Sequence, residues 1–197
     1  MVSAILLAAG EAKRIDRPKL LMPFGGGTVL ERTLDNLLTS KVGEVIVVLG
    51  PRAGVIKQVI ADRQVKVVVN PDYHLGMSTS LITGLNLVDD RAQRIMIALA
   101  DQPLIYGETY DRLIEASLSC DKGIIIPVYQ GRRGNPVIFS TKYKQELIKL
   151  KGDVGGRQIV KQYPDDIFEV AVHSESINLD IDTMYDYLRL LSDKVED

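Results

Sequence analysis

The residues Ala4-Ile5-Leu6-Leu7-Ala8-Ala9-Gly10 lead directly into Glu11-Ala12-Lys13-Arg14-Ile15-Asp16-Arg17-Pro18-Lys19-Leu20 near the start of the chain. The first half is apolar and has the length of a strand buried on both faces of a sheet. It is far too short to span a bilayer, and no positively charged region precedes it, so we expect neither a membrane span nor a signal peptide. The second half is a charged loop that follows this strand.

Beyond this strand, apolar runs of strand length alternate with amphipathic stretches of helix length. The expected strands are residues 4–8, 44–49, 65–69, 95–98, 123–128, 136–139 and 167–172. Such alternation indicates βαβ units with right-handed crossovers and a mostly parallel sheet. The last two runs break the alternation, so the sequence predicts a mixed sheet in an α/β fold.

Most of the expected helices have recognisable starts. Thr28 and Glu31 have the spacing of a capping box, and Thr183 and Asp186 repeat that spacing before the last helix. The other expected helices begin at Ser78, which we expect to be an N-cap, at residue 107 and at Thr141.

Composition and charge limit the classes of function. The formal net charge of -2 and a pI of about 5.8 provide no overall positive field for nucleic acid or an anionic membrane surface. Cys120 is the only cysteine, which excludes an internal disulfide, and no Cys/His cluster has zinc-site spacing. We expect a cytoplasmic protein of one domain, residues 1–197, that needs local cations or a metal ion to bind an anionic ligand.

The loop after the first strand has the composition of a phosphate-binding turn. Ala8, Ala9 and Gly10 are small enough for a ligand to approach the backbone, whose N–H groups bind anions. The cations Lys13, Arg14, Arg17 and Lys19 follow closely. A triphosphate carries about four negative charges, so the combination favours a nucleoside triphosphate, with a solvated basic loop as the alternative. The loop follows the first strand of an α/β sheet, and this position favours a triphosphate-binding site over a solvated basic loop.

Two other nucleotide-binding motifs are not met. Gly25-Gly26-Gly27-Thr28 lacks the lysine of a P-loop, and no G-x-G-x-x-G follows the first strand. The missing glycine fingerprint disfavours a nucleotide-dependent oxidoreductase.

Acidic residues lie at two further positions of interest. Asp101 ends a buried strand, where a carboxylate is costly unless it is paired or bound to a metal. Magnesium favours one or two carboxylates together with phosphate oxygens, whereas the alternative role of Asp101 is to cap the turn before Pro103. Asp180 and Asp182 precede the last helix and share one face of an extended segment. For Asp182, an interaction with the dipole of that helix is the competing interpretation.

Several segments together resemble the MobA-like nucleotidyltransferases, and among them the molybdenum cofactor cytidylyltransferases. They are Leu7-Ala8-Ala9-Gly10 with Arg14, Pro18-Lys19-Leu20-Leu21, Gly76-Met77-Ser78-Thr79-Ser80, Leu99-Ala100-Asp101-Gln102-Pro103, Gly134-Asn135-Pro136, Gly152-Asp153-Val154-Gly155-Gly156-Arg157 and Asp180-Ile181-Asp182. The resemblance covers nearly the whole chain. The chain departs from the family pattern at Ala12, Ile15 and Asp16, where Ser, Met and Gly are usual.

The resemblance implies a fold, a reaction and a cofactor. The fold would be a Rossmann-like three-layer α/β/α sandwich of the nucleotide-diphospho-sugar transferase type. The enzyme would transfer CMP from CTP to molybdopterin with Mg²⁺ and release pyrophosphate, and a molybdoenzyme would receive the product. Arg14, Lys19 and Asp101 would be catalytic, and Asp101 and Asp182 would bind the metal. The nucleotide would contact Ala8, Ala9, Gly10, Lys19, Gly76, Ser80 and Asp101.

Acceptor and base recognition have weaker signals. Arg133, Asn135 and Arg157 are candidates for the acceptor, because a pterin has an amide-like edge and its phosphate suits arginine. A hairpin turn is the alternative for Gly134-Asn135-Pro136, and hydrogen bonding at a helix start is the alternative for Ser80.

Other functions stay open at this point. The same fold accommodates a guanylyltransferase that uses GTP, or an enzyme that acts on a sugar or alcohol phosphate. A non-catalytic module that binds and delivers a cofactor is the alternative from another class.

Overall fold

The computed structural model describes residues 1–11, 14–15 and 17–192. Within them one large sheet has the strand order β10-β7-β9-β6-β1-β4-β5, with β8 paired to β7. The strands are β1 (Val2–Ala8), β4 (Glu44–Leu49), β5 (Lys66–Val69), β6 (Arg94–Leu99), β7 (Ile124–Tyr129), β8 (Arg132–Arg133), β9 (Val137–Ser140) and β10 (Ile167–Ala171). Each predicted strand is present within about two residues of its expected bounds.

The sheet is mixed, as predicted. Strands β6, β1, β4 and β5 are parallel neighbours, whereas β9 runs antiparallel to both β6 and β7. The edge strand β10 is parallel to β7. Because β1 and β6 are parallel and adjacent, their carboxyl ends open onto the same edge of the sheet.

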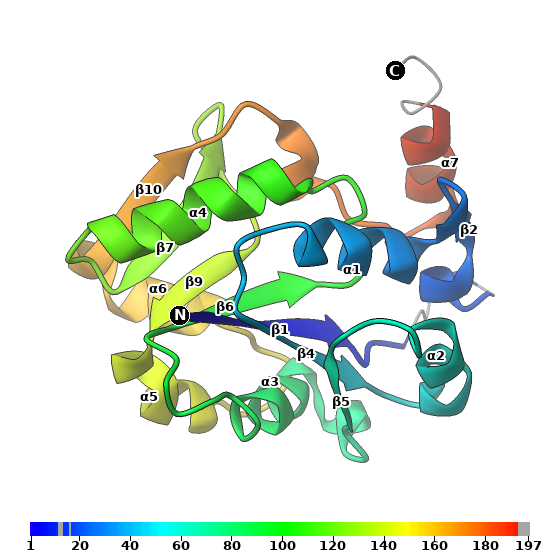
Figure 1. Ribbon diagram of the computed structural model, residues 1–197, viewed down its shortest axis with the longest axis horizontal. Helices are drawn as coiled ribbons and strands as arrows, with labels where there is room; N and C mark the ends of the chain where they lie inside the picture. Colours follow the sequence, from blue (N-terminus) through cyan, green and yellow to red (C-terminus); the bar gives the residue numbers. More distant parts are fainter. Residues whose placement is uncertain (12–13, 16, 193–197) are drawn as a thin grey trace.

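Helices cover both faces of this sheet (Figure 1). Figure 1 shows α1 and α4 on one face and α3 and α5 on the other. The helices are α1 (Val29–Leu38), α2 (Ala53–Val59), α3 (Met77–Leu85), α4 (Gly107–Ser119), α5 (Lys144–Ile148), α6 (Arg157–Gln162) and α7 (Met184–Ser192). Short 3₁₀ segments are η1 (Lys19–Leu21), η2 (Tyr73–Leu75), η3 (Thr141–Tyr143), η4 (Pro164–Asp166) and η5 (Glu175–Asn178), and β2 (Pro23–Phe24) and β3 (Gly27–Thr28) form a small hairpin.

Two hydrophobic clusters correspond to the two faces. Ala4 and Leu6 of β1 belong to the cluster that includes α1 and α4, whereas Ile5 belongs to the cluster with Leu81 of α3. Successive side chains of a strand point to opposite faces, so a strand that is apolar throughout fills both cores. The result is the expected three-layer α/β/α arrangement. No helix in the described part of the chain is long and apolar enough to cross a membrane.

The helix starts confirm some predictions and correct others. The Thr28 hydroxyl accepts a hydrogen bond from the Glu31 N–H at 3.2 Å, and the Glu31 carboxylate accepts one from the Thr28 N–H at 2.9 Å, so the predicted capping box is present. The predicted box between Thr183 and Asp186 is also present. The prediction for Thr141 was wrong in detail, because Ser140 caps a 3₁₀ turn that precedes α5.

The prediction that Ser78 is an N-cap was wrong. Gly76 occupies that position, and Ser78 is buried inside the first turn of α3. The first N–H groups of this helix donate to the neighbouring turn instead: Met77 N to Asp153 Oδ1 and Ser78 N to the Gly152 carbonyl oxygen, each at 3.2 Å. A capping side chain is unnecessary where other segments accept these hydrogen bonds.

Candidate nucleotide and metal site

Three segments far apart in sequence meet at the carboxyl ends of β1 and β6. The Lys19 ammonium lies 2.6 Å from Asp101 Oδ2 and 3.2 Å from Asp182 Oδ1. The backbone holds this arrangement, because Ala100 N donates to the Leu7 carbonyl and Ile181 N donates to the Asp101 carbonyl, both at 3.1 Å. The last of these bonds fixes the segment before α7 beside the end of β6.

The two ion pairs differ in their exposure to water. The side chains of Lys19 and Asp101 are 14% and 17% exposed, whereas that of Asp182 is 45% exposed. Burial by itself lowers the pKa of Lys19, but attraction to Asp101 and hydrogen bonds to both carboxylates outweigh it and raise the pKa. Lys19 therefore carries a fixed positive charge at neutral pH.

The site contains more carboxylates than Lys19 can neutralise. Asp180 borders the same cleft, and its pKa is raised by burial and by the negative charges of Asp101 and Asp182. Three carboxylates beside the Lys19 ammonium leave an excess of negative charge, which favours the binding of a further cation.

The donor atoms fit a divalent cation. Asp101 Oδ1 is buried and has no hydrogen-bond partner among the described residues, which is unusual for a buried oxygen. No group of three or more Asp, Glu, His or Cys side chains in the described ranges is close enough to hold a metal alone. Magnesium needs only one or two carboxylates when phosphates and water complete its shell, so a pair such as Asp101 and Asp182 would be enough.

Arg14 has a weaker contact with the same cluster. Its guanidinium lies 3.3 Å from Asp182 Oδ2, and its side chain is 72% exposed. An exposed pair of this kind contributes little to stability and is free to exchange partners. The neighbouring Ala12, Lys13 and Asp16 lie outside the described residues.

All of the predicted nucleotide-binding residues border one cleft of about 630 Å³. They are Ala8, Ala9, Gly10, Lys19, Gly76, Ser80 and Asp101. The Ser80 hydroxyl accepts a hydrogen bond from the Asn70 amide at 3.0 Å, and a hydroxyl that accepts can also donate its own hydrogen to a ligand. Tyr73 and His74 also border the cleft, and the sequence motifs do not indicate a role for them. Their position just before Gly76 was the available signal.

Gly76 is required by the local geometry. Its φ of 109° lies in the region that favours glycine, and a Cβ there would lie 2.5 Å from the carbonyl carbon of Gly152. The close approach brings the turn at Gly152 and Asp153 against the start of α3. This turn forms part of the cleft wall through Asp153.

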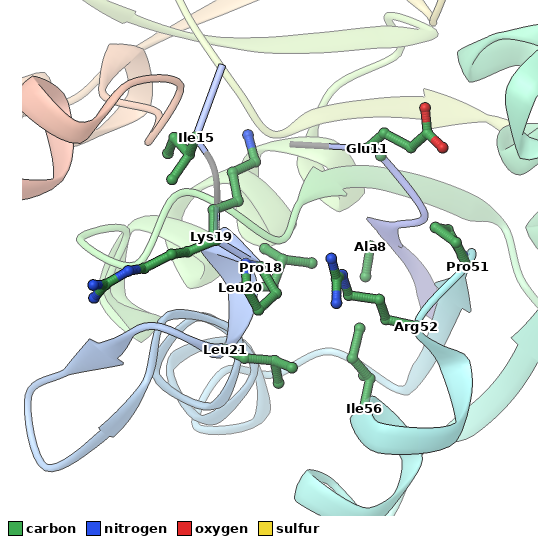
Figure 2. Close-up of a pocket in the computed structure, with 12 residues that line it drawn as sticks. Ala8, Glu11, Ile15, Pro18, Lys19, Leu20, Leu21, Pro51, Arg52 and Ile56 are labelled. Atoms are coloured by element: carbon green, nitrogen blue, oxygen red, sulfur yellow. The ribbon is translucent and has the colours of Figure 1, made fainter. Parts of the chain in front are cut away.

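A second hollow of about 580 Å³ lies against the first loop and the start of α2. Figure 2 shows the Arg52 guanidinium reaching across it, while the Lys19 ammonium points away from Arg52 and Ile56. Lys19 is thus directed to the carboxylate cluster rather than to this hollow.

The three predicted acceptor residues are not brought together. Asn135 and Arg157 line a third hollow of about 520 Å³, which has Asp153 and Asp180 in common with the nucleotide cleft. Arg133 does not line it; its guanidinium pairs with Glu169 of β10 at 2.6 Å. The hairpin turn is formed by residues 130 and 131, so Asn135 lies beyond it.

The sequence and structure match those of known proteins. A family model described as the MobA-like NTP transferase domain matches residues 4–167. The chain is 30% identical over 202 residues to nicotine blue oxidoreductase of Paenarthrobacter nicotinovorans, with 96% of each protein covered. It is 26% identical to the molybdenum cofactor cytidylyltransferase of Escherichia coli K12, with 95% of this chain and 94% of that protein covered.

One similar solved structure is a complex with manganese. The manganese complex of Rv0371c from Mycobacterium tuberculosis H37Rv has a TM-score of 0.85 and 33% identity, covering 97% of this chain and 98% of that one. With the fold, the cleft and these matches established, the chain belongs to the MobA-like NTP transferase family and is a nucleotidyltransferase of the nucleotide-diphospho-sugar transferase fold.

Proposed function

We propose that residues 1–197 act as one domain that transfers CMP from CTP to molybdopterin. The observation that carries this proposal is the meeting of Lys19, Asp101 and Asp182 at the edge of the cleft. The likeness to the Escherichia coli cytidylyltransferase supports the choice of substrates. Transfer of the product to a molybdoenzyme and a cytoplasmic location remain predictions from the sequence.

The reaction needs little covalent chemistry from the protein. An oxygen of the acceptor phosphate attacks the α-phosphorus of CTP, and the bond from that phosphorus to the oxygen bridging to the β-phosphate breaks. Pyrophosphate leaves with the electron pair. The acceptor phosphate is already ionised, so positioning and electrostatic stabilisation provide the rate.

Each residue of the cluster has a role in this scheme. Lys19 stays protonated and stabilises charge on the phosphoryl oxygens, and Arg14 is close enough to assist. Mg²⁺ held by Asp101 and Asp182 would supply Lewis-acid stabilisation of the phosphates. Ser80 and the backbone of Ala8 and Ala9 would read the cytosine edge from within the cleft.

Pyrophosphate release tests the proposal directly. The protein is supplied with Mg²⁺, molybdopterin and, in turn, CTP, GTP, ATP or UTP, and we expect release with CTP alone. Asp101→Asn should abolish turnover and keep the fold, whereas the exposed Asp121→Asn serves as a matched control. Unchanged turnover in Asp101→Asn contradicts its metal role.

Other outcomes distinguish the alternatives. Release with GTP favours a guanylyltransferase, and release with a sugar or alcohol phosphate as acceptor favours that branch of the fold. Tight nucleotide binding without release with any acceptor favours a module that binds and delivers a cofactor.

A redox activity is the second candidate, because the chain is 30% identical to nicotine blue oxidoreductase over nearly its whole length. The sequence lacks the glycine fingerprint of dinucleotide-binding Rossmann proteins after β1. We therefore expect no oxidation of NADH or NADPH in the presence of nicotine blue. Oxidation without pyrophosphate release in the first assay would replace the transferase proposal.

A further inference from the structure

The hollow of about 580 Å³ beside the start of α2 meets the nucleotide cleft at the first loop. The residues that line both are Ala8, Gly10, Glu11, Lys19 and Leu20. A ligand that extends from the cleft past the first loop therefore enters this hollow.

The three hollows follow the order of the strands along the edge of the sheet. The one with Asn135 and Arg157 lies against β6 and β9, and the cleft lies at the ends of β6 and β1. The hollow beside α2 lies at the end of β1 and the turn after β4. Because the strand order is β9-β6-β1-β4, the cleft lies between the other two hollows.

The turn after β4 is held against the start of the first loop. A Cβ at Gly50 would lie 2.5 Å from the Ala9 carbonyl oxygen, so only a glycine allows this close approach. The Ala53 N–H donates to the Gly50 carbonyl at 3.2 Å and closes the turn. Arg52 lies within this turn, and its place beside the first loop is therefore set by the backbone.

Two arginines of the hollow are available to an anion. Arg17 and Arg52 line it, and neither side chain has an ion pair or a hydrogen bond with another described residue. Lys19 also lines it, but its ammonium is paired with carboxylates of the cleft. Figure 2 shows Arg52 extending into the hollow, whereas the Glu11 carboxylate points away from Arg52. Glu11 is the only acidic residue among the described residues that line this hollow.

The surroundings of these guanidinium groups are partly apolar. Ile15, Leu20 and Ile56 are buried and line the hollow together with Leu21. Attraction between charges is stronger beside apolar groups than in open water, because the local dielectric constant is lower. An anion with several charges therefore gains more here than beside a fully solvated arginine.

The proposed reaction produces such an anion on this side of the cleft. In phosphoryl transfer the attacking and leaving oxygens are roughly in line, on opposite sides of the phosphorus. An acceptor phosphate that approaches from the side of Asn135 and Arg157 expels pyrophosphate towards the opposite side, where Arg52 lies.

We propose that Arg52 binds the β- and γ-phosphates of the nucleotide and then the departing pyrophosphate, with Arg17 as a second partner. A guanidinium group donates two parallel N–H bonds to phosphate oxygens. When the bond from the α-phosphorus to the bridging oxygen breaks, the electron pair stays with pyrophosphate, and both arginines stabilise the added charge. This inference rests on the proposed transferase function. It assigns a role to the turn after β4, which none of the sequence motifs includes.

Inorganic pyrophosphate tests the contact without any reaction. It is titrated into the full chain in a calorimeter, with Mg²⁺ and no acceptor. We expect Arg52→Gln and Arg17→Gln each to weaken pyrophosphate binding about tenfold, the scale of one lost charge-assisted hydrogen bond, and CTP binding to a similar extent. The matched control is Lys57→Gln, which changes an exposed lysine of α2 that does not line the hollow.

Binding of CMP separates a phosphate contact from a general effect on the cleft, because CMP has no β- or γ-phosphate. We expect the affinity of Arg52→Gln for CMP to stay within about twofold of the native value. The inference is overturned if the native protein does not bind pyrophosphate, if Arg52→Gln binds it as well as the native protein, or if CMP binding falls equally. Any of these results would leave pyrophosphate release as an independent test of the transferase. Weakened pyrophosphate binding in a protein that releases none keeps this site and removes the transferase.

Discussion

Lys19→Met removes one charge from the centre of the site and retains a side chain of similar length. In the native protein the Lys19 ammonium contacts Asp101 at 2.6 Å and Asp182 at 3.2 Å. In the native protein the Asp101 side chain is 17% exposed, and one of its oxygens already has no partner among the described residues, so the substitution removes the ammonium that its other oxygen contacts. Loss of the Lys19 ammonium should therefore lower both the stability of the fold and the rate of the reaction.

The size of the effect follows from the burial of each pair. The pair with the half-exposed Asp182 contributes about 0–1 kcal/mol. The pair with Asp101 is largely desolvated, and a hydrogen bond between charged groups contributes about 1.5–3 kcal/mol. We expect a net loss of about 2–3 kcal/mol, since removing the ammonium also removes its own desolvation cost. For a chain of this length, that corresponds to a Tm lower by roughly 4–12 °C.

The pH dependence has a definite sign. The pKa of Lys19 is raised in the folded state, so its contribution to stability is fully present below the unfolded value of about 10.4. It is lost as the pH rises through the folded pKa. The difference in Tm between native protein and variant should be constant from about pH 7 to 9 and shrink above about pH 10.5.

Scanning calorimetry and the pyrophosphate assay measure these effects. We expect Mn²⁺ to raise the Tm of Lys19→Met more than that of the native protein, because the carboxylates have lost their own cation. Turnover should fall about 10²- to 10³-fold. The control is Lys149→Met, which changes an exposed lysine. A variant with native Tm and native turnover would refute the assignment of Lys19.

Three further predictions concern single positions. Ser80→Ala should raise KM for CTP about 2- to 10-fold with little change in kcat, as steady-state kinetics would show; an unchanged KM argues against a base contact. Gly76→Ala should destabilise the fold by about 1–3 kcal/mol, because its Cβ would meet the carbonyl carbon of Gly152 at 2.5 Å; a native urea midpoint contradicts this. The pKa of Asp166 is about 2, because hydrogen bonds from Lys142 and Tyr143 outweigh the opposing effect of burial. Asp166→Asn should cost about 2 kcal/mol near neutral pH, and the difference from the native protein should close as the pH falls from about 4 to 2; a gap that persists at pH 2 is the contrary result.

Local signals explain what could be predicted along the chain. The capping boxes at Thr28 and Thr183 involve residues three apart, so the sequence contains both partners. The start of α3 could not be predicted in this way, because its N–H groups bond to Gly152 and Asp153, which are distant in sequence. Helices α2 and α6 were not predicted, because they have only seven and six residues. A stretch of that length is too short for a helical repeat of apolar residues to be recognised.

The sequence by itself determined the layers of the fold and the nature of the first loop, because strand burial and small or basic residues are properties of short segments. Only the tertiary structure decided which distant residues meet. It joined Lys19 to Asp101 and Asp182, and it paired Arg133 with Glu169 rather than placing it beside Asn135 and Arg157. These outcomes depend on strand order and on backbone contacts between segments as far apart as Asp101 and Ile181. They cannot be predicted from local sequence patterns, because the partners are distant in sequence.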